Sequence, residues 1–271
     1  MKQQATAATV CLAASMVSAV AGAQVADAPL TTANVWTRYG ALLRAVVRRG
    51  GVDYAGVRER LGELRLIHAW LGEHGPTATP AAFASANARK AYWLNAYNAT
   101  VLLGVAEAPA TMRNVMTYLP DGGFFRARHW RLDGRELTLD AVENREVRPV
   151  FRDPRVHMAL NCGARSCPPL YDGAYVPGAL DRQLDALARG YVNAASNVAV
   201  DEAARAVRVA QIFEWFRDDF AGAGGVVAWL RSYAAPTLRA ALEAACGADA
   251  GACTVRYRRY DWSLNSATPT P

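Results

Sequence analysis

The chain has 271 residues, a formal net charge of +6 and 52% hydrophobic residues, which is typical of a globular protein with one large domain or two small ones. Lys2 and Lys90 are the two lysines, so nearly all of the positive charge is arginine, scattered among nearby acidic residues. Nucleic-acid-binding proteins typically gather basic residues on one face. This pattern therefore predicts no nucleic-acid partner.

The first 23 residues resemble a cleaved export signal. Lys2 gives a positive start, a small apolar stretch runs from Ala5 to Val20, and Ala21–Ala23 places small residues at the cleavage positions. The stretch is too short for a spanning helix, and no later segment approaches membrane-span length. We expect residues 1–23 to be a signal peptide, 24–265 one domain and 266–271 a loose tail. The protein is then periplasmic or secreted, with no integral membrane span.

Apolar residues at helical spacing predict three helices in the first part of the chain. The first runs over residues 35–47 and ends before Gly50-Gly51, and the second covers residues 61–71. The third runs from about Pro80 to Val105. Asp133-Gly134 then lies between two alternating arms, which predicts a β-hairpin.

The segments after the hairpin predict a mixture of helices and strands. Thr138 or Asp140 is a plausible cap for a short helix. Residues 156–160 form an apolar run that predicts a buried strand entering a loop with two cysteines. Further predictions are helices over 180–191, 211–220 and 226–245, a hairpin over 198–210, and a last strand over 254–262. The predicted fold is α+β, a single domain of many helices packed on a small, mainly antiparallel sheet.

Four cysteines remain after export: Cys162, Cys167, Cys246 and Cys253. An even count in an oxidising compartment predicts disulfides. Three pairings exist, and we favour 162–167 with 246–253 because the partners are close along the chain. Each short loop contributes roughly 2 kcal/mol on the chain-entropy estimate.

Several segments together resemble the family named domain of unknown function 547. The matching segments are VDYAGV (52–57), KAYWLNAYNA (90–99), LTLDAVENREVRP (137–149), DPRVHMALNCGARSCPPL (153–170), IFEWFRDDF (212–220) and YDWSLN (260–265). The resemblance implies an exported bacterial single-domain protein whose biochemical activity is not established. Many members have Glu-His where this chain has Glu143-Asn144, so we expect no mechanism that requires this second histidine.

The first functional hypothesis is an exported thiol-dependent hydrolase or acyl/amide transferase. Cys162 is the candidate nucleophile, and His157, five residues earlier, is its candidate base. A free thiol is only about 3% thiolate at pH 7, so Cys162 needs activation by its surroundings. Cys-His enzymes use a third group to orient the base. We expect this group among Asn95, Glu143 and Asp153, with Asn161 as a further candidate.

Polar side chains near these residues are candidates for substrate binding. Asn95 and Asn98 lie at i and i+3 on one face of an apolar helix. An unpaired buried amide costs about 1–3 kcal/mol, so both need partners. They hold the backbone of a neighbouring loop, such as the cysteine loop, or bind a polar substrate group, and the two roles can coexist. We assign substrate binding to Asn98, Asn161 and Arg165.

The second hypothesis is a disulfide-stabilised, non-catalytic binding or scaffold module of the cell envelope, with an unidentified small-molecule or envelope ligand. Cys162 is then bonded to Cys167, and His157 is a core histidine. A dithiol oxidoreductase is disfavoured because four residues separate these cysteines rather than two. A zinc site on the same three side chains has no evident fourth ligand, so we expect no metal and no cofactor. Asp219 is expected to cap a helix or to pair with an arginine such as Arg148 or Arg165.

Overall fold

A computed structural model describes residues 29–49, 51–248 and 250–267. The predicted signal peptide lies outside the described residues, as do residues 268–271 of the predicted tail. Ser266 and Ala267, which that tail prediction included, instead pair with Val52.

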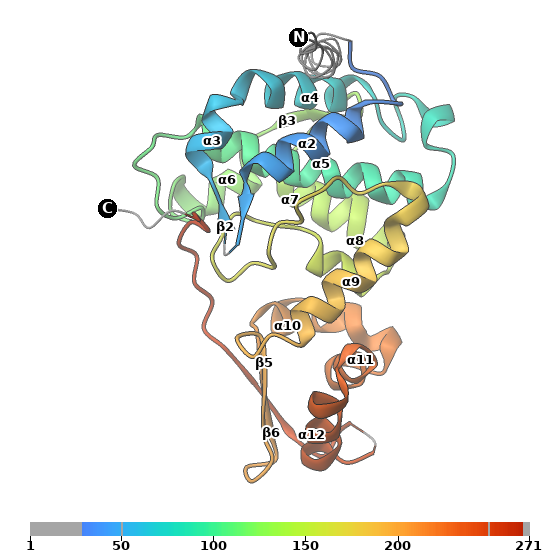
Figure 1. Ribbon diagram of the computed structural model, residues 1–271, viewed down its shortest axis with the longest axis vertical. Helices are drawn as coiled ribbons and strands as arrows, with labels where there is room; N and C mark the ends of the chain where they lie inside the picture. Colours follow the sequence, from blue (N-terminus) through green and yellow to red (C-terminus); the bar gives the residue numbers. More distant parts are fainter. Residues whose placement is uncertain (1–28, 50, 249, 268–271) are drawn as a thin grey trace, which may run out of the picture.

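The first part of the chain forms a helical body around one central helix, α5 (Figure 1). Every residue of α5 from Lys90 to Ala106 is buried, as expected for a helix covered on all sides. Ser85 begins the helix by accepting a hydrogen bond from the Ala88 amide. Because η1 precedes this cap, the helix predicted from Pro80 is two elements. The bounds are α2 Val35–Val46, α3 Tyr54–Glu59, α4 Leu61–Glu73, η1 Pro80–Phe83, α5 Ala86–Glu107, η2 Pro120–Gly122 and α6 Gly123–Arg126.

The segment that carries most of the candidate residues is built from short helical turns. Thr138 caps α7 by accepting a hydrogen bond from the Ala141 amide, as predicted. The strand predicted over 156–160 is wrong: residues 154–158 form a 3₁₀ helix. Pro154 is preset for a first helical position, and Asp153 caps the turn at the Arg155 amide. The bounds are α7 Leu139–Ala141, η3 Val142–Val147, α8 Arg148–Phe151, η4 Pro154–Met158 and η5 Pro177–Ala179.

The strands form three small sheets in the described residues. β5 and β6 are antiparallel, whereas β7 lies parallel to β6 because α10–α12 intervene before the chain returns. The Asp133-Gly134 hairpin is confirmed, with φ of 52° and 73° at its two left-handed turn residues. The fold class is α+β, as predicted. The bounds are β1 Val47–Arg48, β2 Gly51–Val52, β3 Trp130–Leu132, β4 Arg135–Leu137, β5 Val198–Asp201, β6 Ala206–Val209 and β7 Thr254–Tyr257.

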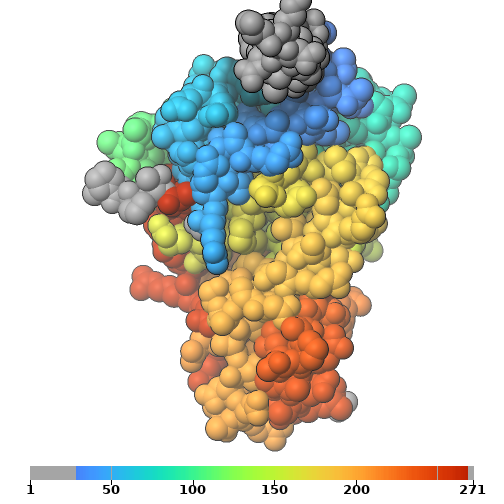
Figure 2. All heavy atoms as spheres, in the orientation of Figure 1, coloured from blue at the N-terminus to red at the C-terminus, as the bar shows by residue number. Residues whose placement is uncertain are grey.

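The end of α9, the β5–β7 sheet and helices α10–α12 form a narrower lower lobe, coloured from orange to red in Figure 2. The hydrophobic core is correspondingly divided into two clusters among the described residues, one in the helical body and one in the lower lobe. Pro236 starts a new helix, so the single helix predicted over 226–245 is split. The bounds are α9 Leu180–Val192, α10 Ile212–Trp215, η6 Arg217–Ala223, α11 Val226–Tyr233 and α12 Pro236–Cys246. No helix within the described ranges is long and apolar enough to cross a lipid bilayer.

The Cys246–Cys253 disulfide is present and joins the end of α12 to the start of β7. We expect Cys253→Ala to lower the free energy of unfolding by about 2–3 kcal/mol, because the opened loop restores entropy to the unfolded chain. Urea unfolding of variant and native protein measures this difference. Treating native protein with a reductant should lower its free energy of unfolding by the same amount. An unchanged urea midpoint in both cases would show that the disulfide does not stabilise the fold.

Candidate functional site

Asn95 and Asn98 hold the backbone of neighbouring loops. Asn98 donates to the Ala159 carbonyl at 2.9 Å and accepts from the Asn161 amide at 2.9 Å. It therefore fastens to α5 the start of the loop that carries Cys162 and Cys167, the cysteine loop. Asn95 makes the equivalent pair with Tyr175, at 2.8 and 2.9 Å. Both amides are buried and used in these bonds. The structural interpretation is confirmed, and no contact of Asn95 with His157 is found among the described residues.

Asn161 also shapes the cysteine loop from within. Its side-chain oxygen accepts from the Gly163 amide at 3.0 Å and from Asn265 at 3.2 Å, and its amide group donates to the Pro168 carbonyl at 2.7 Å. Gly163 has φ of 80°, which favours glycine at this turn. The buried Asn161 side chain therefore holds the loop together and does not line the thiol cavity described below.

Asp153 belongs to a separate ion-pair network. Its carboxylate accepts from Lys90 at 2.7 Å and from Arg155 at 2.8 and 2.9 Å, and these bonds, acting against burial, hold its pKa below the ordinary value. Arg155 extends the network to Asp181 and Asp185. Both oxygens of Asp153 thus accept hydrogen bonds from cations, and none is found with His157 among the described residues.

Cys162 and Cys167 are free cysteines, so the predicted disulfide between them is absent. Instead, the Cys162 amide donates to the Cys167 sulfur at 2.9 Å, and the Cys162 sulfur lies 3.3 Å from the Tyr260 hydroxyl. Burial by itself raises the pKa of Cys162, but hydrogen bonds from Cys167, Tyr260 and the Ala164 backbone together lower it below the ordinary value. Burial and the neighbouring Cys162 raise the pKa of Cys167. The two thiols are thus unequal, and Cys162 is the one suited to ionise.

Both thiols line a cavity of about 450 Å³ between the helical body and the lower lobe, which we call the thiol cavity. Three predicted residues, Cys162, His157 and Glu143, line it together. Its polar wall also includes Tyr97 and Tyr260, and its apolar wall includes Met116, Phe125, Leu160, Ile212, Trp215, Phe216 and Trp262. The fold therefore unites the candidate nucleophile with two titratable side chains in one space large enough for a small ligand.

Glu143 lies in the widened, π-helical turn η3. Pro149 follows this turn and has no N–H to donate to the Arg145 carbonyl, which favours the widening. Burial raises the pKa of Glu143 to about 7, against the opposing effects of Arg148 and of a hydrogen bond from Tyr97. A carboxyl group that titrates near neutral pH can both donate and accept a proton.

The raised pKa of Glu143 predicts a pH-dependent contribution to stability. Because the folded pKa of about 7 exceeds the ordinary 4.5, this contribution is complete below about pH 4.5 and is lost as the pH rises through 7. The free energy of unfolding lost over this pH range is on the order of 3 kcal/mol. We expect Glu143→Gln to gain stability relative to native protein between pH 5 and pH 8, measured by urea unfolding. The exposed Glu59→Gln is the control, and parallel pH profiles for native protein and Glu143→Gln would contradict the raised pKa.

His157 is oriented by Asp219 rather than by any residue predicted for that role. The His157 Nε2 atom lies 2.7 Å from Asp219 Oδ2, and Arg148 donates to both oxygens of the same carboxylate at 2.7 and 3.1 Å. The predicted Asp219–Arg148 pair is confirmed. The His157 ring stacks on Phe216 at 4.2 Å and is 1% exposed, and burial lowers its pKa in spite of Asp219. Its Nδ1 atom is buried without a partner among the described residues.

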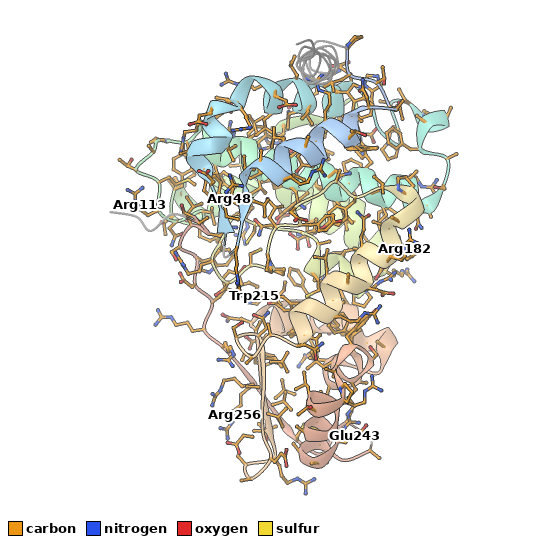
Figure 3. The ribbon with its side chains drawn as sticks, in the orientation of Figure 1. Arg48, Arg113, Arg182, Trp215, Glu243 and Arg256 are labelled. Atoms are coloured by element: carbon orange, nitrogen blue, oxygen red, sulfur yellow. A yellow bond between two sulfur atoms is a disulfide. The ribbon has the colours of Figure 1, made fainter. Side chains whose placement is uncertain are left out.

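An aromatic cluster of Trp215, Tyr260 and Trp262 borders the thiol cavity. The Tyr260 ring lies 4.7 Å from Trp215 and 4.5 Å from Trp262. Trp215 is 43% exposed and lies where the helical body meets the lower lobe (Figure 3). Sequence reasoning missed this cluster. The available signal was the presence of IFEWFRDDF and YDWSLN among the segments that resembled the family.

Arg165, predicted to bind substrate, does not line the thiol cavity. It is exposed, lies 3.8 Å from Asp261 and lines a different cavity, described below. The described residues contain no group of three or more His, Cys, Asp or Glu side chains arranged to hold a metal ion.

Residues 81–192 match the model of a protein family described as "Protein of unknown function, DUF547". The match supports, over this segment, the family that the motifs predicted, and the segment contains α5, η3 and the cysteine loop. Comparisons with curated proteins and with solved structures found no significant match. The family description assigns no molecular function, so the geometry of the site is the basis for proposing one.

Proposed function

We propose that this protein is a thiol-dependent hydrolase or acyl/amide transferase of the cell envelope, with Cys162 as its nucleophile. The observation that carries the proposal is that one cavity is lined by both a thiol of lowered pKa, Cys162, and a carboxyl group of pKa about 7, Glu143. Enzymes that transfer acyl groups need a nucleophile and a group that exchanges protons near the working pH.

The proposed reaction has two steps. The Cys162 thiolate attacks the carbonyl carbon of an ester, thioester or amide, and the bond to the leaving group breaks as neutral Glu143 supplies its proton. A thioester on Cys162 and an ionised Glu143 result. Water or another acceptor then attacks the thioester while Glu143 takes up the acceptor's proton, which releases the acyl product and restores the thiolate.

Glu143 suits the proton-transfer role better than His157, the base first expected. Glu143 is a half-buried residue that lines the cavity, and its pKa lies near neutral. The His157 ring is almost fully buried and bound to Asp219. We assign to His157, Asp219 and Arg148 the positioning of Phe216 and of the adjoining cavity wall.

The test is to trap the thioester. Mature protein is incubated with p-nitrophenyl acetate, quenched in acid and analysed by intact and peptide mass spectrometry. The proposal predicts one acetyl group on the peptide that carries Cys162 in native protein and in Cys167→Ser, and none on that peptide in Cys162→Ser. Labelling only at other nucleophiles, such as Lys90 and tyrosine hydroxyls, with none on Cys162, would leave the binding or scaffold module as the better hypothesis.

The two candidates for the proton-transfer group are separated by a pH profile. We expect Glu143→Gln to remove the inflection near pH 7 in the rate of ester turnover and to lower the rate about 10²-fold or more, as for loss of a general acid–base group. His157→Gln should lower the rate without moving the inflection. If the inflection disappears in His157→Gln and persists in Glu143→Gln, His157 is the base.

A further inference from the structure

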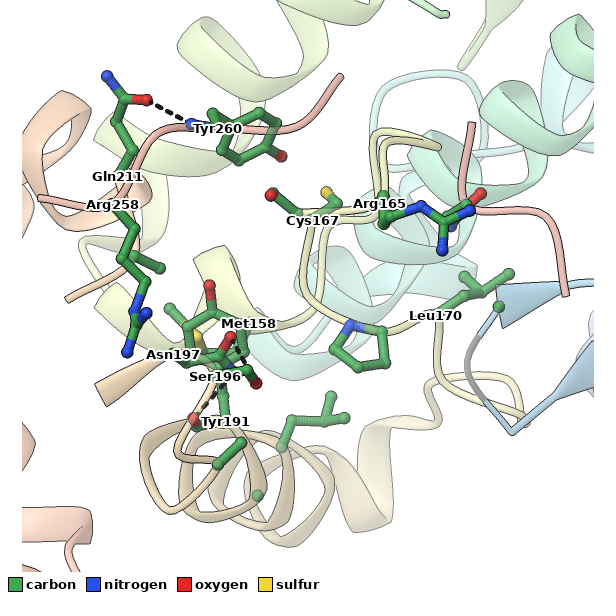
Figure 4. A pocket seen from close by; sticks show the side chains of 18 of the residues that line it. Met158, Arg165, Cys167, Leu170, Tyr191, Ser196, Asn197, Gln211, Arg258 and Tyr260 are labelled. Atoms are coloured by element: carbon green, nitrogen blue, oxygen red, sulfur yellow. Dashed lines mark hydrogen bonds between the residues drawn. The ribbon is translucent and has the colours of Figure 1, made fainter. Parts of the chain in front are cut away.

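A second cavity, of about 480 Å³, shares Cys167 and Tyr260 with the thiol cavity (Figure 4). The cysteine loop, α9 and the segment that precedes Tyr260 line it, together with part of the β1–β2 hairpin. Its lining includes Arg48, Arg165, Arg258 and Arg259 and no Asp or Glu. We call this space the arginine cavity.

The positive charge of this cavity is weakly neutralised. Arg48 lies 3.7 Å from Asp53 and Arg165 lies 3.8 Å from Asp261, and all four side chains are substantially exposed. Ion pairs this long between exposed side chains have little interaction energy, so the carboxylates hold these arginines only weakly. Arg259 has no hydrogen bond or ion pair with any residue in the described ranges. An incoming anion therefore meets cations that are already hydrated and available.

Two buried donors on the cavity lining have no acceptor among the described residues. Tyr191 is 4% exposed, and its hydroxyl has no hydrogen-bond partner among these residues. The Nε atom of Arg258 is likewise buried without a partner. Arg258 is held by one bond, from Nη2 to the Ala195 carbonyl at 3.0 Å. Figure 4 shows the Arg258 guanidinium and Tyr191 on one side of the cavity, with Arg165 and Cys167 across it. Buried donors without an acceptor are costly, so a ligand that brings acceptor oxygens would satisfy both.

We propose that the arginine cavity binds an anionic group, a phosphate or a carboxylate. These groups suit the lining because guanidinium donors form short, charge-assisted hydrogen bonds with their oxygens. The neutral polar side chains Ser196, Asn197 and Gln211 on the lining add further hydrogen-bonding capacity. The proposal does not depend on chemistry at Cys162, since these residues lie outside the thiol cavity.

Isothermal titration of the mature protein with inorganic phosphate, and separately with citrate, at low ionic strength tests the proposal. We expect one saturable site, with a preference between the two probes that assigns the anion as phosphate or carboxylate. Arg259→Gln should weaken binding on the order of tenfold, since it removes a charge-assisted contact. This variant removes no hydrogen bond of the fold, and Tyr191→Phe, which removes only the unpartnered hydroxyl, should weaken binding on the order of threefold.

The matched control is Arg256→Gln. Arg256 lies on β7 close to Arg258 in sequence, is exposed, and lines a different cavity (Figure 3). Arg256→Gln and Arg259→Gln each remove one positive charge. An equal loss of affinity in the two variants would therefore mean that long-range attraction alone binds the anion, and it would overturn the site. Absence of saturable binding, or binding unchanged in both Arg259→Gln and Tyr191→Phe, would also overturn it. Cys162→Ser should bind as native protein does, which separates this proposal from the fate of the proposed catalysis.

Discussion

Cys162→Ala is expected to lower the turnover of p-nitrophenyl acetate and of a small thioester by at least about 10³-fold, because loss of a nucleophile removes the covalent route. The measurement is the steady-state rate on purified protein, with the folded state checked by circular dichroism. Cys162 is partly buried in a loop held by Asn98 and Asn161, so a small side chain should be accommodated without loss of the fold.

Cys167→Ala is the matched control for this substitution. Cys167 supports Cys162 by hydrogen bonding and has a raised pKa, so its removal should raise the pKa of Cys162 and slow turnover by a smaller factor at neutral pH. The rate should recover as the pH increases and Cys162 ionises. Equal losses for the two alanine variants at every pH would contradict Cys162 as the nucleophile.

Asn98→Ala is expected to destabilise the protein by about 2–4 kcal/mol, since it leaves the buried Asn161 amide without an acceptor and opens a small cavity. The Ala159 carbonyl keeps a bond from the Tyr175 hydroxyl, at 3.1 Å, which limits the loss. Urea unfolding followed by tryptophan fluorescence gives the change in free energy.

Asn95→Ala separates stability from function in the same helix. Asn95 makes an equivalent pair of bonds, but with Tyr175 rather than with the cysteine loop. Both variants should lose stability by a comparable amount, whereas only Asn98→Ala should change the reactivity of Cys162. If both variants leave that reactivity unchanged, Asn98 does not position the thiol.

Local sequence patterns predicted much of the fold. Helical spacing located α2, α4, α5 and α9, and Asp133-Gly134 located the hairpin, because periodicity and turn chemistry are properties of neighbouring residues. The strand predicted over residues 156–160 was wrong for the same reason. An apolar stretch this short fits a strand or a helical turn, and Pro154 with the Asp153 cap decided for the turn.

The candidate site was only partly predictable. Cys162, His157 and Glu143 were found because they belong to motifs within one segment of the chain, and the fold brings all three to the thiol cavity. Asp219 and Tyr260 come from distant segments, and no local pattern reports which carboxylate approaches His157 or which hydroxyl approaches Cys162. Asn95 and Asn98 were recognised as buried amides that need partners. Their partners proved to be chiefly backbone groups, which sequence spacing does not reveal.

The central claim is that Cys162 is an activated thiol and Cys167 its protonated neighbour. The most direct measurement is the rate of iodoacetamide alkylation of each cysteine in the native protein between pH 5 and pH 10, read by peptide mass spectrometry. We predict that Cys162 alkylates with an apparent pKa below the ordinary thiol value of about 8.5, and that Cys167 reacts only above that value. A Cys162–Cys167 disulfide in the purified mature protein, or an apparent pKa of Cys162 above that of Cys167, would contradict the claim.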